Sequence, residues 1–142
     1  MRVIAQPSRE LKALQRFVIK NTLSEFPVHQ AAAAYVEDRN IRENAIEHVQ
    51  SKVLLKLDFQ DFFPSITVAD WERYAKASSY EFQRGELSLY SRILFWGRRS
   101  HEPRCLSIGA PSSPLLSNIL LFDVDTKLAA AAFPLPEGEG QG

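Results

Sequence analysis

The chain has 142 residues, of which 45% are hydrophobic, 24% charged and 11% aromatic, a composition typical of one folded domain and not of a disordered or coiled-coil protein. One cysteine excludes a disulfide framework and a cysteine-rich zinc site, and no apolar run is long enough to span a membrane, so we expect a cytoplasmic protein without membrane contact. The net charge is zero, but residues 1–56 carry nine Lys and Arg against six Asp and Glu, which fits a nucleic-acid partner or an ordinary solvated surface.

The first fifty residues predict two helices. Apolar residues recur at helical spacing over residues 8–23, and Ser8 is a suitable cap for this helix. The small apolar run at 31–36 fits either a helix or a buried loop. Asn40 is expected to cap a second, short helix, in which one face carries Ile41, Ala45 and Val49.

The segment KVLLKLD, residues 52–58, predicts a buried strand, because it is short, apolar and bounded by polar residues. Its last residue, Asp58, can present a carboxylate at a cleft, or it can cap the turn that follows. Asp61 lies three residues further on, where it can act as a second carboxylate or as a turn cap. A carboxylate pair at this spacing, together with substrate phosphates, suits Mg²⁺.

The second half of the chain predicts helices separated by a strand and a turn. Gly97 is expected to stop the middle helix, and one glycine with two prolines within six residues requires a turn. Residues 134–142 are rich in Pro, Gly and Glu and predict a disordered tail. In chain order we expect a helix at 67–77, a helix at 86–96, a short strand at 105–109, a turn at 109–114 and a helix at 114–132.

Five strings of this sequence, taken in order, resemble the reverse transcriptases of bacterial retrons and group II introns, most closely the retron type. The strings are RVIAQPSRELKALQR (2–16), AAYVEDRNIRENAIEH (33–48), LLKLDFQDFFPSI (54–66), ILFW (93–96) and LSIGAPSSPLLSN (106–118). The resemblance implies an α+β fold: the fingers and part of the palm of a right-hand polymerase, mostly helical with a few short antiparallel palm strands. The fingers would take about residues 1–50 and the incomplete palm about 51–133.

The resemblance also implies an activity, RNA-directed DNA polymerisation. Such enzymes join a dNTP to a primer, and two Mg²⁺ ions stabilise the attacking and leaving oxygens. The implied partners are an RNA template, a DNA primer or RNA–DNA hybrid, and dNTP.

The resemblance also implies roles for individual residues in the matching motifs. Asp58 matches the catalytic aspartate that binds the metal ions, and the backbone carbonyl of Phe59 is a candidate metal ligand. Phe63 matches the steric gate that excludes a ribose 2′-hydroxyl, whereas Phe62, on the other side of a strand, is expected in the core. The residues that the resemblance assigns to dNTP binding are Arg2, Asp61, Phe63 and Gly109.

The loop at 109–114 matches the family's loop under the templating base and the primer. Small residues there let the base pair approach the backbone closely. The family often has Gln immediately before this glycine, and this chain has Ile108, which cannot hydrogen-bond a nucleotide.

The family's second carboxylate motif, an Asp-Asp hairpin, does not occur in this sequence. Asp123 and Asp125 instead match a helix that precedes the hairpin. We therefore expect a truncated reverse transcriptase that is inactive alone, that exposes apolar surface or self-associates, and that a complementing chain with the missing palm and thumb would complete. The alternatives are a catalytically dead remnant that binds nucleic acid or a partner, and a helical interaction domain unrelated to polymerases.

Overall fold

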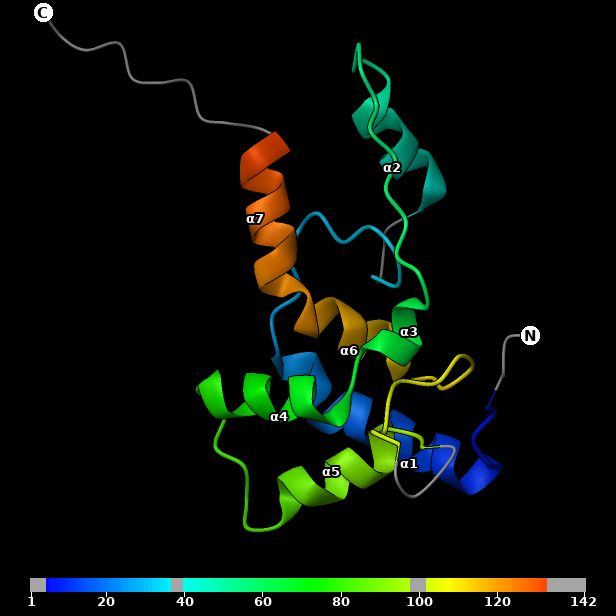
Figure 1. Ribbon diagram of the computed structural model, residues 1–142, viewed down its shortest axis with the longest axis vertical. Helices are drawn as coiled ribbons and strands as arrows, with labels where there is room; N and C mark the ends of the chain where they lie inside the picture. The colour runs from blue at the N-terminus through cyan, green and yellow to red at the C-terminus, as the bar shows by residue number, and fades with distance from the viewer. Residues whose placement is uncertain (1–4, 37–39, 98–101, 133–142) are drawn as a thin grey trace, which may run out of the picture.

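The computed structural model in Figure 1 describes residues 5–36, 40–97 and 102–132. Arg2 and the expected tail lie outside the described residues. Within those ranges the chain forms short helices joined by irregular segments. They are α1 (Arg9–Asn21), the 3₁₀ helix η1 (Leu23–Glu25), α2 (Ile41–His48), α3 (Phe62–Ser65), α4 (Val68–Ala77), α5 (Glu86–Leu94), α6 (Ser113–Leu120) and α7 (Phe122–Ala132).

The first helix confirms its predicted start. The hydroxyl of Ser8 accepts a hydrogen bond from the backbone N–H of Leu11 at 3.2 Å, which satisfies one of the free donors at the helix N-terminus. The inner face of α1 buries Val18 and Gln15. The Gln15 side chain donates to the carbonyl of Ile93 at 2.9 Å and so ties α1 to α5.

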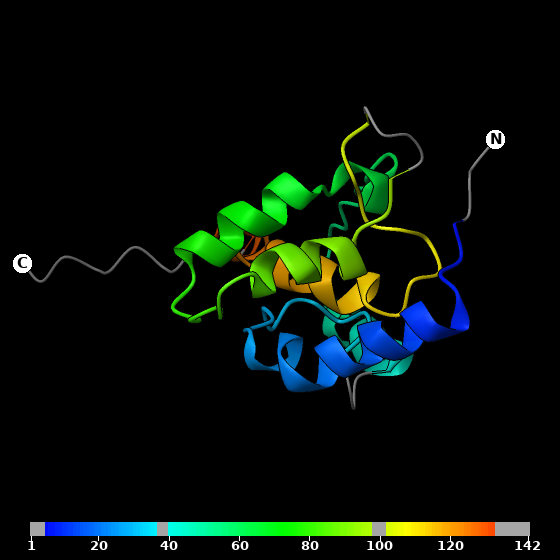
Figure 2. The same cartoon turned by 90° about the horizontal axis from the view of Figure 1, so that it is seen from below.

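The core lies where α1, α4, α5 and α6 meet. Helix α5 lies between α1 and α4, as Figure 2 shows, and α4 also packs on α6. Trp71 of α4 is fully buried, and its ring lies edge-on to Phe26, with ring centroids 6.0 Å apart. Other core residues with at most 1% exposure are Leu23, Leu94, Leu106, Leu116 and Ile119.

Helix α4 begins at the predicted residue because Asp70 satisfies donors at its start. The Thr67 backbone N–H and hydroxyl each donate to Asp70 Oδ2 at 2.8 Å. Burial raises the pKa of Asp70, but the bonds from Thr67 and the charge of Arg73 outweigh it, so that the net pKa is below the ordinary value.

The predicted buried strand at 52–58 is wrong. The segment forms neither helix nor strand, and its side chains are exposed by 85% at Val53, 71% at Leu54 and 78% at Leu55. A strand is buried only when neighbouring strands pair with it and another layer covers its face. The described parts of the chain place no such strand beside it, and Figure 1 shows it as a drawn-out trace between α2 and α3.

The short strand expected at 105–109 is reduced to Cys105. This residue forms isolated antiparallel bridges with Thr67 and Trp96. The mostly helical character of the expected fold is confirmed, whereas the palm strands are absent from the described ranges. The bridge between Trp96 and Cys105 explains why α5 ends at Leu94, before the predicted stop at Gly97. Trp96 exchanges two backbone hydrogen bonds of 2.8 Å with Cys105 and therefore cannot continue the helix.

The helix expected at 114–132 is two helices. Leu121 has φ −91° and ψ 2°, which takes the backbone out of the helical conformation between α6 and α7. Helix α7 therefore leaves the helical body in a new direction (Figure 1).

Helix α2 projects from the body of the protein in Figure 1. Its predicted cap is confirmed, since Asn40 Oδ1 accepts from the N–H of Glu43 at 3.0 Å and the Glu43 carboxylate accepts from the N–H of Asn40 at 3.4 Å. Its apolar face is not buried: Ile41 is 90% exposed and Val49 71%. Among the described helices, none is both long and apolar enough to cross a membrane.

Candidate functional site

The turn that follows residue 58 surrounds a small hollow. Its volume is about 300 Å³. Its lining residues come from the exposed segment, from α3 and from the loop before α6, and they are Asp58, Phe59, Asp61, Phe62, Phe63, Pro64 and Ile108. The structure thus brings Asp58, Asp61 and Phe63 close to Ile108, which lies 45 or more residues further along the chain.

Asp58 and Asp61 both line this hollow. Both side chains are exposed. Asp61 has φ 49° and ψ 44°, a left-handed conformation that is uncommon for a residue other than glycine, and its side chain forms no cap on α3. The alternative role of Asp61 as a side-chain cap is therefore not what the structure has.

Three phenylalanines form the apolar side of the hollow. The ring of Phe62 lies 5.6 Å from Phe59 and 5.2 Å from Phe63, measured between centroids. Phe62 and Phe63 are both half-buried against the core, whereas Phe59 is 59% exposed. Phe62 was expected on the opposite side of a strand from Phe63. This expectation is wrong, because both residues belong to the helical turn α3.

The loop before α6 is held in place by serine side chains. The hydroxyl of Ser113 donates to the carbonyl of Ser107 at 2.8 Å, and the hydroxyl of Ser107 donates to the carbonyl of Ala5. Gly109 has φ +96°, where glycine is favoured because a side chain would be strained. These contacts fix the loop against the N-terminal segment, so that Ile108 reaches the hollow.

Gln6 is a residue of this region that sequence reasoning overlooks. A Cβ atom placed on Gly109 would lie 3.7 Å from the Gln6 side chain, and Lys12 Nζ donates to Gln6 Oε1 at 3.1 Å. No pattern in the sequence predicts this contact, because it joins segments about 100 residues apart.

The oxygen ligands that the hollow offers suit a hard cation such as Mg²⁺ only in part. Carboxylate oxygens are the ligands that Mg²⁺ prefers, and Mg²⁺ is commonly held by one or two carboxylates together with substrate phosphates. Within the described part of the chain, no group of three or more His, Cys, Asp and Glu side chains could hold a metal ion. Asp58 and Asp61 are therefore two candidate carboxylate ligands, too few for a metal site made by protein ligands alone.

The second acidic pair of the sequence lies elsewhere. Asp123 and Asp125 are in α7, as predicted, and neither lines the hollow. Burial raises the pKa of Asp125, and the nearby His29 offsets only part of this effect. These carboxylates do not complete the site around Asp58.

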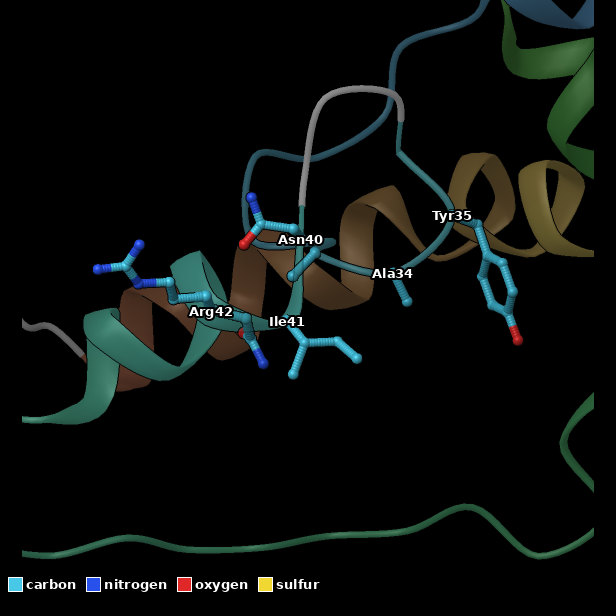
Figure 3. A pocket seen from close by; sticks show the side chains of 7 residues that line it. Ala34, Tyr35, Asn40, Ile41 and Arg42 are labelled. Carbon is cyan, nitrogen blue, oxygen red and sulfur yellow. The ribbon is translucent and has the colours of Figure 1, made fainter.

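A larger hollow, of about 680 Å³, lies beside α2 (Figure 3). Tyr35 lies at its edge with φ 60°, and its ring points away from Arg42. No residue with an expected catalytic role lines it. Its lining residues are Ala33, Ala34, Tyr35, Asn40, Ile41, Arg42 and Asn44.

Comparison with known proteins places this chain in a family. The family described as reverse transcriptase (RNA-dependent DNA polymerase) matches residues 1–137. Similar proteins include the retron Mx162 reverse transcriptase of Myxococcus xanthus, 39% identical over 144 residues that cover 92% of this chain and 29% of that protein. The retron Ec83 and Ec73 reverse transcriptases of Escherichia coli are each 37% identical, over 91% and 90% of this chain and 42% of each relative. This chain thus spans less than half the length of these relatives, and it belongs to the reverse transcriptase family.

Proposed function

We propose that this chain carries the nucleotide-binding half of an RNA-directed DNA polymerase site. The observation that supports the proposal is the hollow in which Asp58, Asp61 and Phe63 face the loop of Ile108. The substrates are a dNTP and the 3′ end of a primer, either DNA or part of an RNA–DNA hybrid, on an RNA template. We place the activity in the cytoplasm, which agrees with a chain that has one cysteine and forms no disulfide framework.

Asp58 and Asp61 orient the triphosphate in this proposal. When bound, Mg²⁺ would neutralise phosphate charge and polarise the reacting phosphoryl group. Asp58, with the backbone carbonyl of Phe59, would hold the ion, and Asp61 would lie beside the triphosphate. Arg2 would contact the phosphates as a guanidinium that stays charged and binds two oxygens at once.

Phe63 and the 109–114 loop select the substrate by shape. Phe63 is packed against Phe62 and the core, so its ring cannot move aside freely. A rigid ring beside the sugar would exclude a 2′-hydroxyl and favour a deoxynucleotide. The loop would lie under the templating base, where Gly109 allows close approach of the backbone.

The chain alone is proposed to bind a nucleotide without extending a primer. The two metal ions of this reaction stabilise the attacking and the leaving oxygens and need carboxylate ligands, and the given sequence has no Asp-Asp motif that would add to Asp58 and Asp61. Residues that supply this motif would complete the site.

Calorimetric titration of dATP into the chain with Mg²⁺ tests the proposal. Asp58→Asn keeps the shape of the side chain and removes its charge, and it is expected to weaken Mg²⁺-dependent dATP binding about tenfold, the size of one lost charge-assisted contact. Glu81→Gln, at an exposed carboxylate that does not line the hollow, is the matched control and should bind as the unaltered chain does.

Two results would count against the proposal. Equal dATP affinity in the unaltered chain and Asp58→Asn would favour the alternative, a remnant that binds nucleic acid or a partner without a nucleotide site. Robust dNTP incorporation by the purified 142-residue chain in a primer-extension assay would refute the claim that the site is incomplete.

A further inference from the structure

The side chain of Gln6 lies against the exposed glycine of the loop before α6. A Cβ atom placed on Gly109 would have Gln6 Cγ and Nε2 as its nearest neighbours, both at 3.7 Å. The two segments are held together close by, because the hydroxyl of Ser107 donates to the carbonyl of Ala5. A ligand that packs on Gly109 is therefore within reach of the Gln6 side chain.

Lys12 fixes which end of the Gln6 amide faces the loop. Its ammonium group can only donate, and Nζ lies 3.1 Å from Gln6 Oε1, so this atom must be the amide oxygen. Nε2 is then the polar atom of Gln6 nearest to Gly109. In the described part of the chain no hydrogen bond uses Nε2 as a donor, so its N–H groups are free to donate to a ligand.

The serine hydroxyls of the loop cannot take this role. Ser113 donates to the carbonyl of Ser107, and Ser107 donates to the carbonyl of Ala5. The Ser112 side chain has 0% exposure, so it cannot reach a ligand on the surface of the loop. Gln6 thus supplies a side-chain donor that the loop itself lacks.

The charge of Lys12 suits this donor to an anionic ligand. An ammonium group at Oε1 polarises the amide and strengthens its N–H groups as donors. Between described residues, no ion pair neutralises Lys12. Hydrogen bonds to an ionised acceptor, such as a phosphate oxygen, are stronger than those to a neutral one.

We propose that Gln6 binds the triphosphate of the deoxynucleotide, with Nε2 donating to a phosphate oxygen beside Gly109. Lys12 is the positioning residue that orients the amide. This inference rests on the proposed nucleotide site, and it adds to that site a residue from the segment before α1.

Calorimetric titration of dATP with Mg²⁺ tests the contact. Gln6→Met keeps the length of the side chain and removes the amide, and it is expected to weaken dATP binding about tenfold, the size of one charge-assisted hydrogen bond. Gln83→Met, at an exposed glutamine before α5 that does not line the hollow around Asp58, is the matched control and should bind dATP as the unaltered chain does. Equal midpoints of urea unfolding in the three chains show that the fold is unchanged.

2′,3′-Dideoxy-ATP identifies the part of the nucleotide that Gln6 contacts. It keeps the triphosphate and lacks the 3′-hydroxyl, so Gln6→Met should weaken its binding as much as that of dATP. A loss seen with dATP but not with the dideoxynucleotide would place the contact on the sugar and overturn the assignment to the triphosphate.

A double-mutant cycle tests the role of Lys12. Lys12→Met alone should weaken dATP binding about threefold, and in the Gln6→Met background it should have no further effect, because it acts through the amide. Lys12→Arg keeps a donor for Oε1 and should restore binding. Additive losses would show that Lys12 acts on the nucleotide itself and would overturn its positioning role.

Failure of this inference can be distinguished from failure of the proposed function. If Asp58→Asn weakens dATP binding and Gln6→Met does not, the nucleotide site stands and the Gln6 contact is refuted. If the unaltered chain does not bind dATP, both are refuted.

Discussion

Replacing Gly109 by alanine separates backbone strain from steric contact in the loop beside the proposed site. The nearest atoms that the new Cβ would meet belong to the Gln6 side chain at 3.7 Å, an ordinary van der Waals contact. The cost must therefore come from the backbone, because φ is +96° and alanine disfavours positive φ.

The magnitude follows from two opposing effects. Left-handed backbone costs a residue with a Cβ roughly 1–2 kcal/mol, and alanine recovers about 0.4–1 kcal/mol by reducing the entropy of the unfolded chain. We expect Gly109→Ala to lower the free energy of unfolding by about 1 kcal/mol, which is a fall of about 3–5 °C in the melting temperature of a domain of this size.

Gly85 provides a matched control. It has φ +82°, no heavy atom lies within 4 Å of the position of its Cβ, and it precedes α5, outside the hollow around Asp58. Gly85→Ala should therefore cost about as much stability as Gly109→Ala.

Urea unfolding of both variants measures the free energies, and the calorimetric dATP titration measures the site. We expect both variants to lose similar stability and only Gly109→Ala to weaken dATP binding. A stabilising Gly109→Ala would refute the argument from backbone strain, and equal loss of dATP binding in both variants would refute the placement of Gly109 beside the nucleotide.

Two further predictions concern stability. Leu116→Ala removes a side chain with 0% exposure and should lower the free energy of unfolding by about 2–5 kcal/mol in urea, whereas Leu128→Ala, at a residue 50% exposed, should cost much less; similar values for the two would contradict the position of the core. Asp70 has a lowered pKa in the folded state, so its carboxylate stabilises the protein above the ordinary Asp pKa, and this contribution is lost as the pH falls through the lower folded-state value. Asp70→Asn should therefore be less stable than the unaltered chain at neutral pH, and the difference should shrink in acid; a difference that is the same at both pH values would show that the charge of Asp70 is not involved.

Features that depend on a few neighbouring residues could be predicted from the sequence. Ser8, Asn40 and Thr67 lie at the starts of their predicted helices, because each of them hydrogen-bonds a residue three positions further along the chain. The turn between Gly109 and Pro114 follows in the same way from residues that cannot continue a helix. The motifs around Asp58 and Gly109 likewise carried the resemblance that the family match confirms.

Features that depend on distant partners could not be predicted in this way. The segment at 52–58 has the composition of a buried strand, but burial requires another strand beside it, and the described structure leaves Val53 and Leu55 exposed. The arrangement of Phe62 and Phe63 also differs from expectation, because α3 is a helical turn and not the end of a strand.

The sequence alone determined the starts of α1, α2 and α4, the turn before α6 and the family, since each is encoded in short strings of residues. Only the tertiary structure decided that Ile108 lies beside Asp58 and Phe63, and that Gln6 packs on Gly109. The physical reason is that these contacts join segments 45 to about 100 residues apart, and their formation depends on how α1, α4, α5 and α6 pack around Trp71.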